Sequence, residues 1–146
     1  MDIAGIQKIL PHRAPMLLID EVETDGPCSV ASYTVKGDEF FLQGHFPGNP
    51  VVPGVILCEM MAQSACLLIN GETGFTPYLT GMDRIRVRKT ARPGDKIVFK
   101  TELLKGKSIF RFIKGEGFID GDICVSGELS FALVKNEEMV QKDRHV

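Results

Sequence analysis

The sequence lacks a strong charge of either sign, a targeting leader and a long hydrophobic run. Its formal charge is -2 and its pI is near 5.9, so composition gives no general attraction to nucleic acid or anionic membranes. The first residues lack the basic region and apolar run of a signal peptide. The main apolar stretch, residues 55–69, is about 15 residues long, whereas a bilayer span needs roughly 20. We therefore expect a cytoplasmic protein that binds neither nucleic acid nor membrane.

Paired metal-binding motifs are also missing. None of the four cysteines belongs to a CxxC pair, which is typical of small buried side chains in a reducing compartment. The three histidines, His12, His45 and His145, have no zinc-like spacing. No glycine-rich phosphate loop or dinucleotide fingerprint follows a predicted strand. We therefore expect no metal and no cofactor.

The length and patterning predict one α+β domain over residues 1–146, with a frayed charged tail from 135 to 146. Residues 55–69 are apolar on nearly every side, which is typical of a helix surrounded by protein. Most of the remaining chain has the alternation of antiparallel strands. The expected architecture is an antiparallel sheet wrapped around one long central apolar helix. The predicted strands and turns are a hairpin over 16–35 with its first strand at 16–23, a strand at 78–87, a turn at Gly106-Lys107, a turn at Asp120-Gly121 and a last strand at 123–134.

A stiff loop carrying His45 runs directly into the apolar helix. The prolines and glycines of GHFPGNPVVPG restrict the backbone where the imidazole is presented, and Pro53 suits a helix start. Asn70-Gly71 predicts the helix end. Glu59 is a carboxylate in apolar surroundings, so it must be partnered, protonated or exposed to a cleft, and burial alone raises its pKa. A structural hydrogen bond is the alternative role for His45.

Two motifs carry a family resemblance. GHFPGNPVVPGVILCEMMAQ, with LPHRAPMLLIDEV upstream, resembles the 3-hydroxyacyl-acyl carrier protein dehydratases of the FabZ/FabA group, which have the hotdog fold. The resemblance extends from Ile9 to about Leu133. It implies that His45 and Glu59 form the catalytic pair, and a Glu at position 59 is the FabZ-type choice. Ala14 departs from the aromatic residue that relatives commonly carry.

The resemblance implies dehydration of 3-hydroxyacyl carrier-protein thioesters to trans-2-enoyl thioesters in fatty acid biosynthesis. His45 would be the base for the C2 proton and Glu59 the acid for the departing hydroxyl. The backbone amide of Gly54, at the helix N-terminus, would polarise the thioester carbonyl, or Gly54 only starts the helix. Gln63 lies on the face of Glu59, where it orients the carboxylate or only hydrogen-bonds the core. Tyr78 matches a gate at the acyl tunnel, or is only a strand aromatic.

His12 is the other histidine to weigh. It lies between a proline and an arginine, after a short amphipathic helix predicted over residues 2–10. This position is typical of a structural hydrogen-bonding histidine, and we interpret it so.

Partners follow from a basic run and from the expected sheet edge. Period-two spacing predicts Arg84, Arg86 and Arg88 on one strand face, which is either a solvated surface or a docking surface for an acidic acyl carrier protein. The segment RKTARPGD replaces a more apolar one in relatives, so the docking residues themselves stay open. The resemblance implies a homodimer, or a hexamer of three dimers, in which His45 of one chain faces Glu59 of the other.

Two other functions are kept. A hotdog acyl thioesterase also uses a helix carboxylate, but the histidine of GHFPG argues against it. A non-catalytic acyl-binding subunit would keep the fold, but a mere binder has no reason to bury a carboxylate beside a stiffly held histidine.

Overall fold

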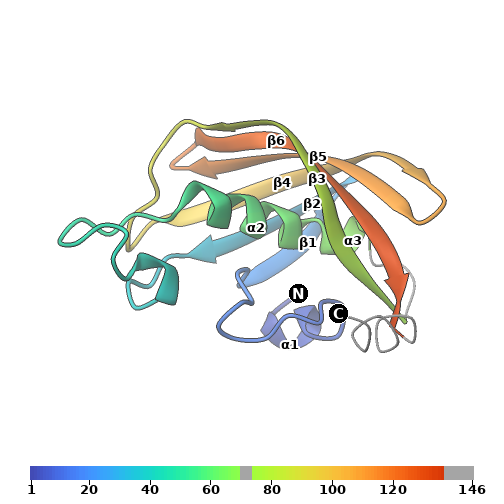
Figure 1. The fold of residues 1–146 in the computed structure, drawn as a ribbon, viewed down its shortest axis with the longest axis horizontal. Helices are drawn as coiled ribbons and strands as arrows, with labels where there is room; N and C mark the ends of the chain where they lie inside the picture. The colour runs from blue at the N-terminus through green and yellow to red at the C-terminus, as the bar shows by residue number, and fades with distance from the viewer. Residues whose placement is uncertain (70–73, 137–146) are drawn as a thin grey trace, which may run out of the picture.

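The computed structural model describes residues 1–69 and 74–136. Its centre is a six-stranded antiparallel sheet in the order β1-β2-β4-β5-β6-β3, which curls around a helix (Figure 1). The α+β prediction of a sheet wrapped around a central helix is confirmed for the described residues. The helices and strands are α1 (Ile3–Ile6), β1 (Glu21–Asp25), β2 (Cys28–Thr34), the 3-10 turn η1 (Phe40–Leu42), α2 (Gly54–Ser64), α3 (Cys66–Ile69), β3 (Phe75–Val87), β4 (Lys96–Lys107), β5 (Phe110–Ile119) and β6 (Asp122–Lys135).

Helix α2 is the core element. Leu57, Met60 and Met61 are fully buried, and each such side chain contributes about 1.5–3 kcal/mol by leaving water. The sheet can close on the helix because Gly115 of β5 has no side chain: a Cβ there would lie 2.6 Å from Met61 Cγ. The apolar surroundings predicted for this helix are therefore real, and they enclose the turn that carries Glu59.

The helix is shorter than predicted. Residues 55–69 do not form one helix, because α2 ends at Ser64 and a turn at Ala65 separates it from α3. At the break, the Ser64 carbonyl accepts from the hydroxyls of Ser29 (2.6 Å) and Thr101 (3.4 Å). The amide of Leu68 bonds to the carbonyl of Ala65 rather than to that of Ser64, so the α-helical pattern is interrupted here. The predicted stop at Asn70-Gly71 lies outside the described residues.

The N-terminal segment also differs from the prediction. The first helix covers only α1, and residues 16–20 are not part of a strand, which begins at Glu21. The backbone there bonds to a side chain instead: Leu18 N donates to Gln63 Oε1 and Met16 O accepts from Gln63 Nε2, both at 2.8 Å. These backbone groups are thus satisfied without a strand partner. Gln63 fastens the N-terminal segment to α2.

Two turns complete the comparison. The β4–β5 turn lies at Ser108 and Ile109 rather than at Gly106-Lys107, with Ser108 in the left-handed region at φ 55°. The β5–β6 turn at Asp120-Gly121 is confirmed, with both residues at positive φ. All four cysteines are buried and free, as predicted. Of the predicted frayed tail, residues 137–146 lie outside the described chain.

Candidate active site

A cavity of about 250 Å³ lies between the N-terminal segment, α2 and β3. Its wall includes His12, Glu59, Gln63 and Tyr78. Larger hollows of about 430 and 520 Å³ lie beside Phe112 and beside Tyr33, but neither contains Glu59 or His45. Chemistry rather than size therefore identifies the candidate site.

Glu59 is held from its own helix. Gln63, one turn further along α2, donates from Nε2 to Glu59 Oε1 at 2.9 Å. The same amide group bonds to Met16 and Leu18, so Gln63 is 2 % exposed and fully anchored. The predicted contact between Gln63 and the carboxylate is present in the structure.

His12, interpreted from the sequence as a structural hydrogen-bonding histidine, lies beside Glu59 on the cavity wall. Its Nε2 lies 3.4 Å from Glu59 Oε1, and the two side chains are 26 % and 27 % exposed. This separation is longer than an ordinary N–H···O hydrogen bond, so the contact is a weak one in the free chain. Only the sequence run LPHR adjoining the predicted helix signalled it, and that run is equally typical of a structural histidine.

The pKa of Glu59 moves opposite to the prediction. Burial raises the pKa of Glu59, as expected. Hydrogen bonds from His12 and Gln63 and the charge interaction with His12 together lower it by more, so the net pKa is below the ordinary value. The sequence reasoning counted the apolar helix and could not see the two donors. Glu59 is therefore a carboxylate at neutral pH in the free chain.

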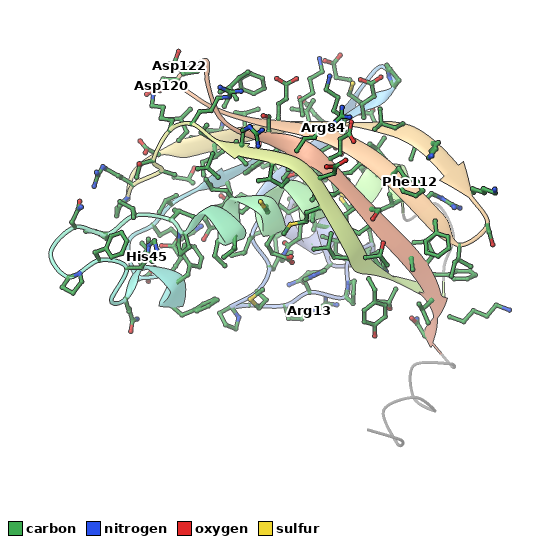
Figure 2. The ribbon with its side chains drawn as sticks, turned by 45° about the horizontal axis from the view of Figure 1, so that its top comes forward. Arg13, His45, Arg84, Phe112, Asp120 and Asp122 are labelled. Atoms are coloured by element: carbon green, nitrogen blue, oxygen red, sulfur yellow. The ribbon has the colours of Figure 1, made fainter. Side chains whose placement is uncertain are left out.

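His45 lies in the loop before α2. Its Nδ1 is 2.9 Å from the Val51 carbonyl, and its ring stacks on Phe46 with centroids 4.2 Å apart. Because a carbonyl only accepts, Nδ1 carries a proton, and in the neutral form of the ring Nε2 keeps a free lone pair. His45 does not line the cavity of Glu59, and among the described residues no hydrogen bond or ion pair joins the two side chains. Figure 2 shows His45 in the loop at the left end, well away from Arg13 beneath α2.

Gly54 and Tyr78 are the other two predicted site residues, and they lie at the start of α2 and on β3. Gly54 is the first residue of α2, where backbone amides have no intrahelical acceptor. A Cβ at Gly54 would lie 3.2 Å from Val87 Cγ2, so β3 approaches the helix start closely. Tyr78 on β3 lines the cavity and is 44 % exposed. The structure thus offers a helix-start amide with no hydrogen-bond acceptor among the described residues, and an aromatic cavity wall.

The three arginines do not share one regular strand face. A bulge lies between Asp83 and Arg86, Arg84 has φ 53°, and Arg88 follows the end of β3. The alternation breaks because Ile85 packs against the core at the bulge. All three arginines are exposed, and within residues 1–69 and 74–136 none forms a salt bridge. Figure 2 shows Arg84 on the upper side of the sheet.

The described residues include neither a metal-binding cluster nor a membrane-spanning helix. They contain no group of three His, Cys, Asp or Glu side chains placed to hold a metal ion. No helix among them is long and apolar enough to cross a bilayer.

The chain matches known sequences over most of its length. The model of the FabA-like domain matches residues 10–128. The chain is 41 % identical over 138 residues to a 3-hydroxyacyl-[acyl-carrier-protein] dehydratase FabZ of Caldicellulosiruptor saccharolyticus, covering 90 % of this chain and 98 % of that protein. It is 42 % identical over 137 residues to the FabZ of Clostridium perfringens strain SM101, covering 91 % and 99 %.

Solved structures agree on the fold. The dehydratase heterocomplex ApeI:P from Xenorhabdus doucetiae aligns with a TM-score of 0.78 and 25 % identity, covering 93 % of this chain and 95 % of that one. The fluoroacetyl-CoA thioesterase FlK aligns with a TM-score of 0.70 at 14 % identity, covering 86 % and 98 %, which supports the hotdog fold alone. Fold and sequence together show that the chain belongs to the FabA-like family, as a FabZ-type 3-hydroxyacyl-acyl carrier protein dehydratase.

Proposed function

We propose that this chain removes water from 3-hydroxyacyl carrier-protein thioesters to give trans-2-enoyl thioesters in fatty acid biosynthesis. The observation that carries the proposal is Glu59, a carboxylate held by two donors inside a cavity, on the helix that follows the stiff His45 loop. A carboxylate and an imidazole with a free lone pair are the two groups that an elimination of water requires. The curated relatives, about 40 % identical, are dehydratases of this kind.

The proposed roles divide the proton transfers. His45 Nε2 accepts the proton from C2, the C3–O bond breaks, and the departing hydroxide takes a proton from Glu59 to leave as water. The Gly54 amide stabilises negative charge on the thioester oxygen. Glu59 must therefore be protonated before each dehydration, and its lowered pKa in the free chain opposes that protonation. The same two groups serve the reverse reaction. There the carboxylate takes a proton from water adding at C3, and protonated His45 returns one to C2.

The site is completed by a second copy of the chain. Strand β3 bonds to β6 on one side only, so its other edge is free to pair with another strand. Large apolar side chains are exposed along this edge and near the helix start. They are Phe46, Val55, Leu79, Met82 and Val87. A two-fold dimer that covers these residues would bring His45 of one chain to Glu59 of the other, and a hexamer of three dimers is compatible with this arrangement.

The acyl carrier protein is the proposed macromolecular substrate carrier. Arg84, Arg86 and Arg88 are exposed cations on a chain with a net charge of -2. They supply local positive potential for an acidic partner even though the bulge breaks their strand alternation. Tyr78, at the mouth of the cavity, is the proposed gate for the acyl chain.

A hydration assay tests this function. The purified chain is mixed with crotonyl carrier-protein thioester, and loss of the conjugated enoyl absorbance is followed together with free thiol. Dehydratase activity predicts loss of absorbance without thiol release. Thiol release would instead indicate a thioesterase, and no change would indicate an acyl-binding protein.

A further inference from the structure

Gln63 and His12 both contact the same carboxylate oxygen of Glu59. Gln63 Nε2 lies 2.9 Å and His12 Nε2 lies 3.4 Å from Oε1. Within residues 1–69 and 74–136, no hydrogen bond or ion pair engages Oε2. The carboxylate is therefore held at one end, and its second oxygen is the one left for chemistry.

The segment that carries His12 is tied down rather than loose. Arg13 donates from Nη1 to the carbonyls of Leu10 (3.0 Å) and His12 (2.7 Å), and from Nη2 to that of Gln7 (3.1 Å). Leu10 is buried in a second apolar cluster, which anchors the segment to β1 and β2. His12 thus meets Glu59 from a backbone fixed on both sides.

The surroundings of His12 determine its tautomer. A carboxylate oxygen can only accept, so Nε2 carries the hydrogen that points at Glu59. The buried Nδ1 has no hydrogen-bond partner among the described residues. His12 is therefore aimed at Oε1 through Nε2, and its other ring nitrogen forms no hydrogen bond in the described part of the chain.

We propose that His12 is a positioning residue, which together with Gln63 fixes Glu59 Oε1 so that Oε2 alone faces the substrate. This inference rests on the proposed dehydratase function. In this role His12 does not contact the substrate, because it acts only through the carboxylate of Glu59. Among the described residues, Tyr78 is the other titratable side chain on the cavity wall, so few groups compete for control of Glu59.

Two substitutions separate positioning from simple packing. His12→Leu removes the donor, and His12→Gln restores an amide Nε2 of similar reach. We expect kcat of His12→Leu to fall about 10- to 100-fold, because a misplaced catalytic group loses the alignment of the reacting atoms. KM should stay within about 2-fold, and His12→Gln should recover much of kcat. A rise in KM with unchanged kcat, or equal losses in both variants at equal melting temperature, would overturn the proposal.

A titration of Glu59 tests the contact without any assay of activity. Protein labelled with ¹³C at the Glu side-chain carboxyls is titrated by NMR, and the Glu59 signal is assigned by its loss in Glu59→Gln. His12→Leu should raise the pKa of Glu59 relative to wild type, and His12→Gln should bring it back. An unchanged pKa in folded His12→Leu would overturn the positioning role. Absence of dehydratase activity in the wild type, with the titration shifted as expected, would instead refute the proposed function alone.

Discussion

The two halves of the proposed catalytic pair are built in opposite ways. Glu59 lies on a core helix and is contacted by two side chains of its own chain, Gln63 and His12. His45 lies in a loop, bonds to one backbone carbonyl and stacks on Phe46, which is itself 54 % exposed. One half is complete within the single chain, and the other lies beside surface that none of residues 1–69 and 74–136 covers. The comparison supports the proposal that a second copy of the chain brings the two halves together.

The same contrast explains the exposed apolar residues. Val55 is 70 % exposed on a helix that is otherwise buried beyond its first turns. An apolar side chain at that level of exposure beside a free strand edge is typical of a surface that another copy covers. The following predictions test each half in turn.

Replacing the carboxylate should have the largest effect. Glu59→Gln keeps the size and the hydrogen bonding of the side chain but removes its titratable proton. We expect retained folding and a fall in turnover of roughly 10² or more. Turnover on a carrier-protein thioester and melting temperature are measured together, with the exposed Glu102→Gln as the control. A near-normal rate would make Glu59 structural.

Charging the free strand edge should have the next largest effect. Met82→Lys places a cation on β3 where the proposed partner strand packs, and lysine on an edge opposes pairing. We expect sedimentation to show dissociation and activity to fall at least roughly 10-fold, because both halves are needed for a site. Ile109→Lys makes the same change on the β4–β5 turn and should do neither. Dissociated Met82→Lys with full activity would contradict a shared site.

Reversing the basic surface should affect only the carrier-protein substrate. Arg84→Glu with Arg86→Glu removes the local positive potential without touching the cavity, so kcat/KM should fall about 10-fold for the carrier-protein substrate and little for a small acyl thioester analogue. Lys105→Glu with Lys107→Glu is the matched control on the β4–β5 hairpin. Added salt should reduce the wild-type advantage. Equal losses on both substrates would place the docking surface elsewhere.

The smallest effect is expected at Glu39, which braces the chain just before the His45 loop. Burial raises its pKa, but hydrogen bonds from the Lys36 and Gly37 amides and the Tyr33 hydroxyl lower it below its ordinary value near 4.5. Its stabilising effect is therefore full above pH 4.5 and is lost as the pH falls through the lowered folded value.

The variant Glu39→Gln should consequently lower the free energy of unfolding by about 1 kcal/mol at pH 7. The difference from wild type should shrink below about pH 4.5. Urea unfolding at several pH values measures it, with the neighbouring Asp38→Asn as the control. A difference that does not change with pH would mean that the charge of Glu39 does not matter.

Local patterns predicted the framework because their physics is local. The apolar residues of α2, the alternation along β6 and the Asp120-Gly121 turn each determine their own conformation. The Glu59–Gln63 contact follows from helical spacing alone. These features need no knowledge of distant residues.

Features that depend on distant residues were predicted wrongly. The helix break at Ala65 needs hydroxyls from β2 and β4, which sequence spacing cannot bring to Ser64. The direction of the Glu59 pKa shift needs His12, which lies 47 residues away in the chain and reaches the helix only through the fold. The prediction that the arginines share one strand face was wrong because the strand bulges at Arg84, where Ile85 packs on the core. Long-range contacts, rather than local propensity, decided each of these cases.

Complementation between two inactive variants tests the shared site most directly. His45→Ala and Glu59→Ala chains are co-expressed with different affinity tags, and dimers that carry both tags are purified. Each mixed dimer should hold one site with both groups intact. Random mixing makes about half the dimers mixed, so the unfractionated mixture should recover roughly a quarter of wild-type activity, and the purified mixed dimers about half. Verified mixed dimers with no activity would place His45 and Glu59 in the same chain's site and contradict the account.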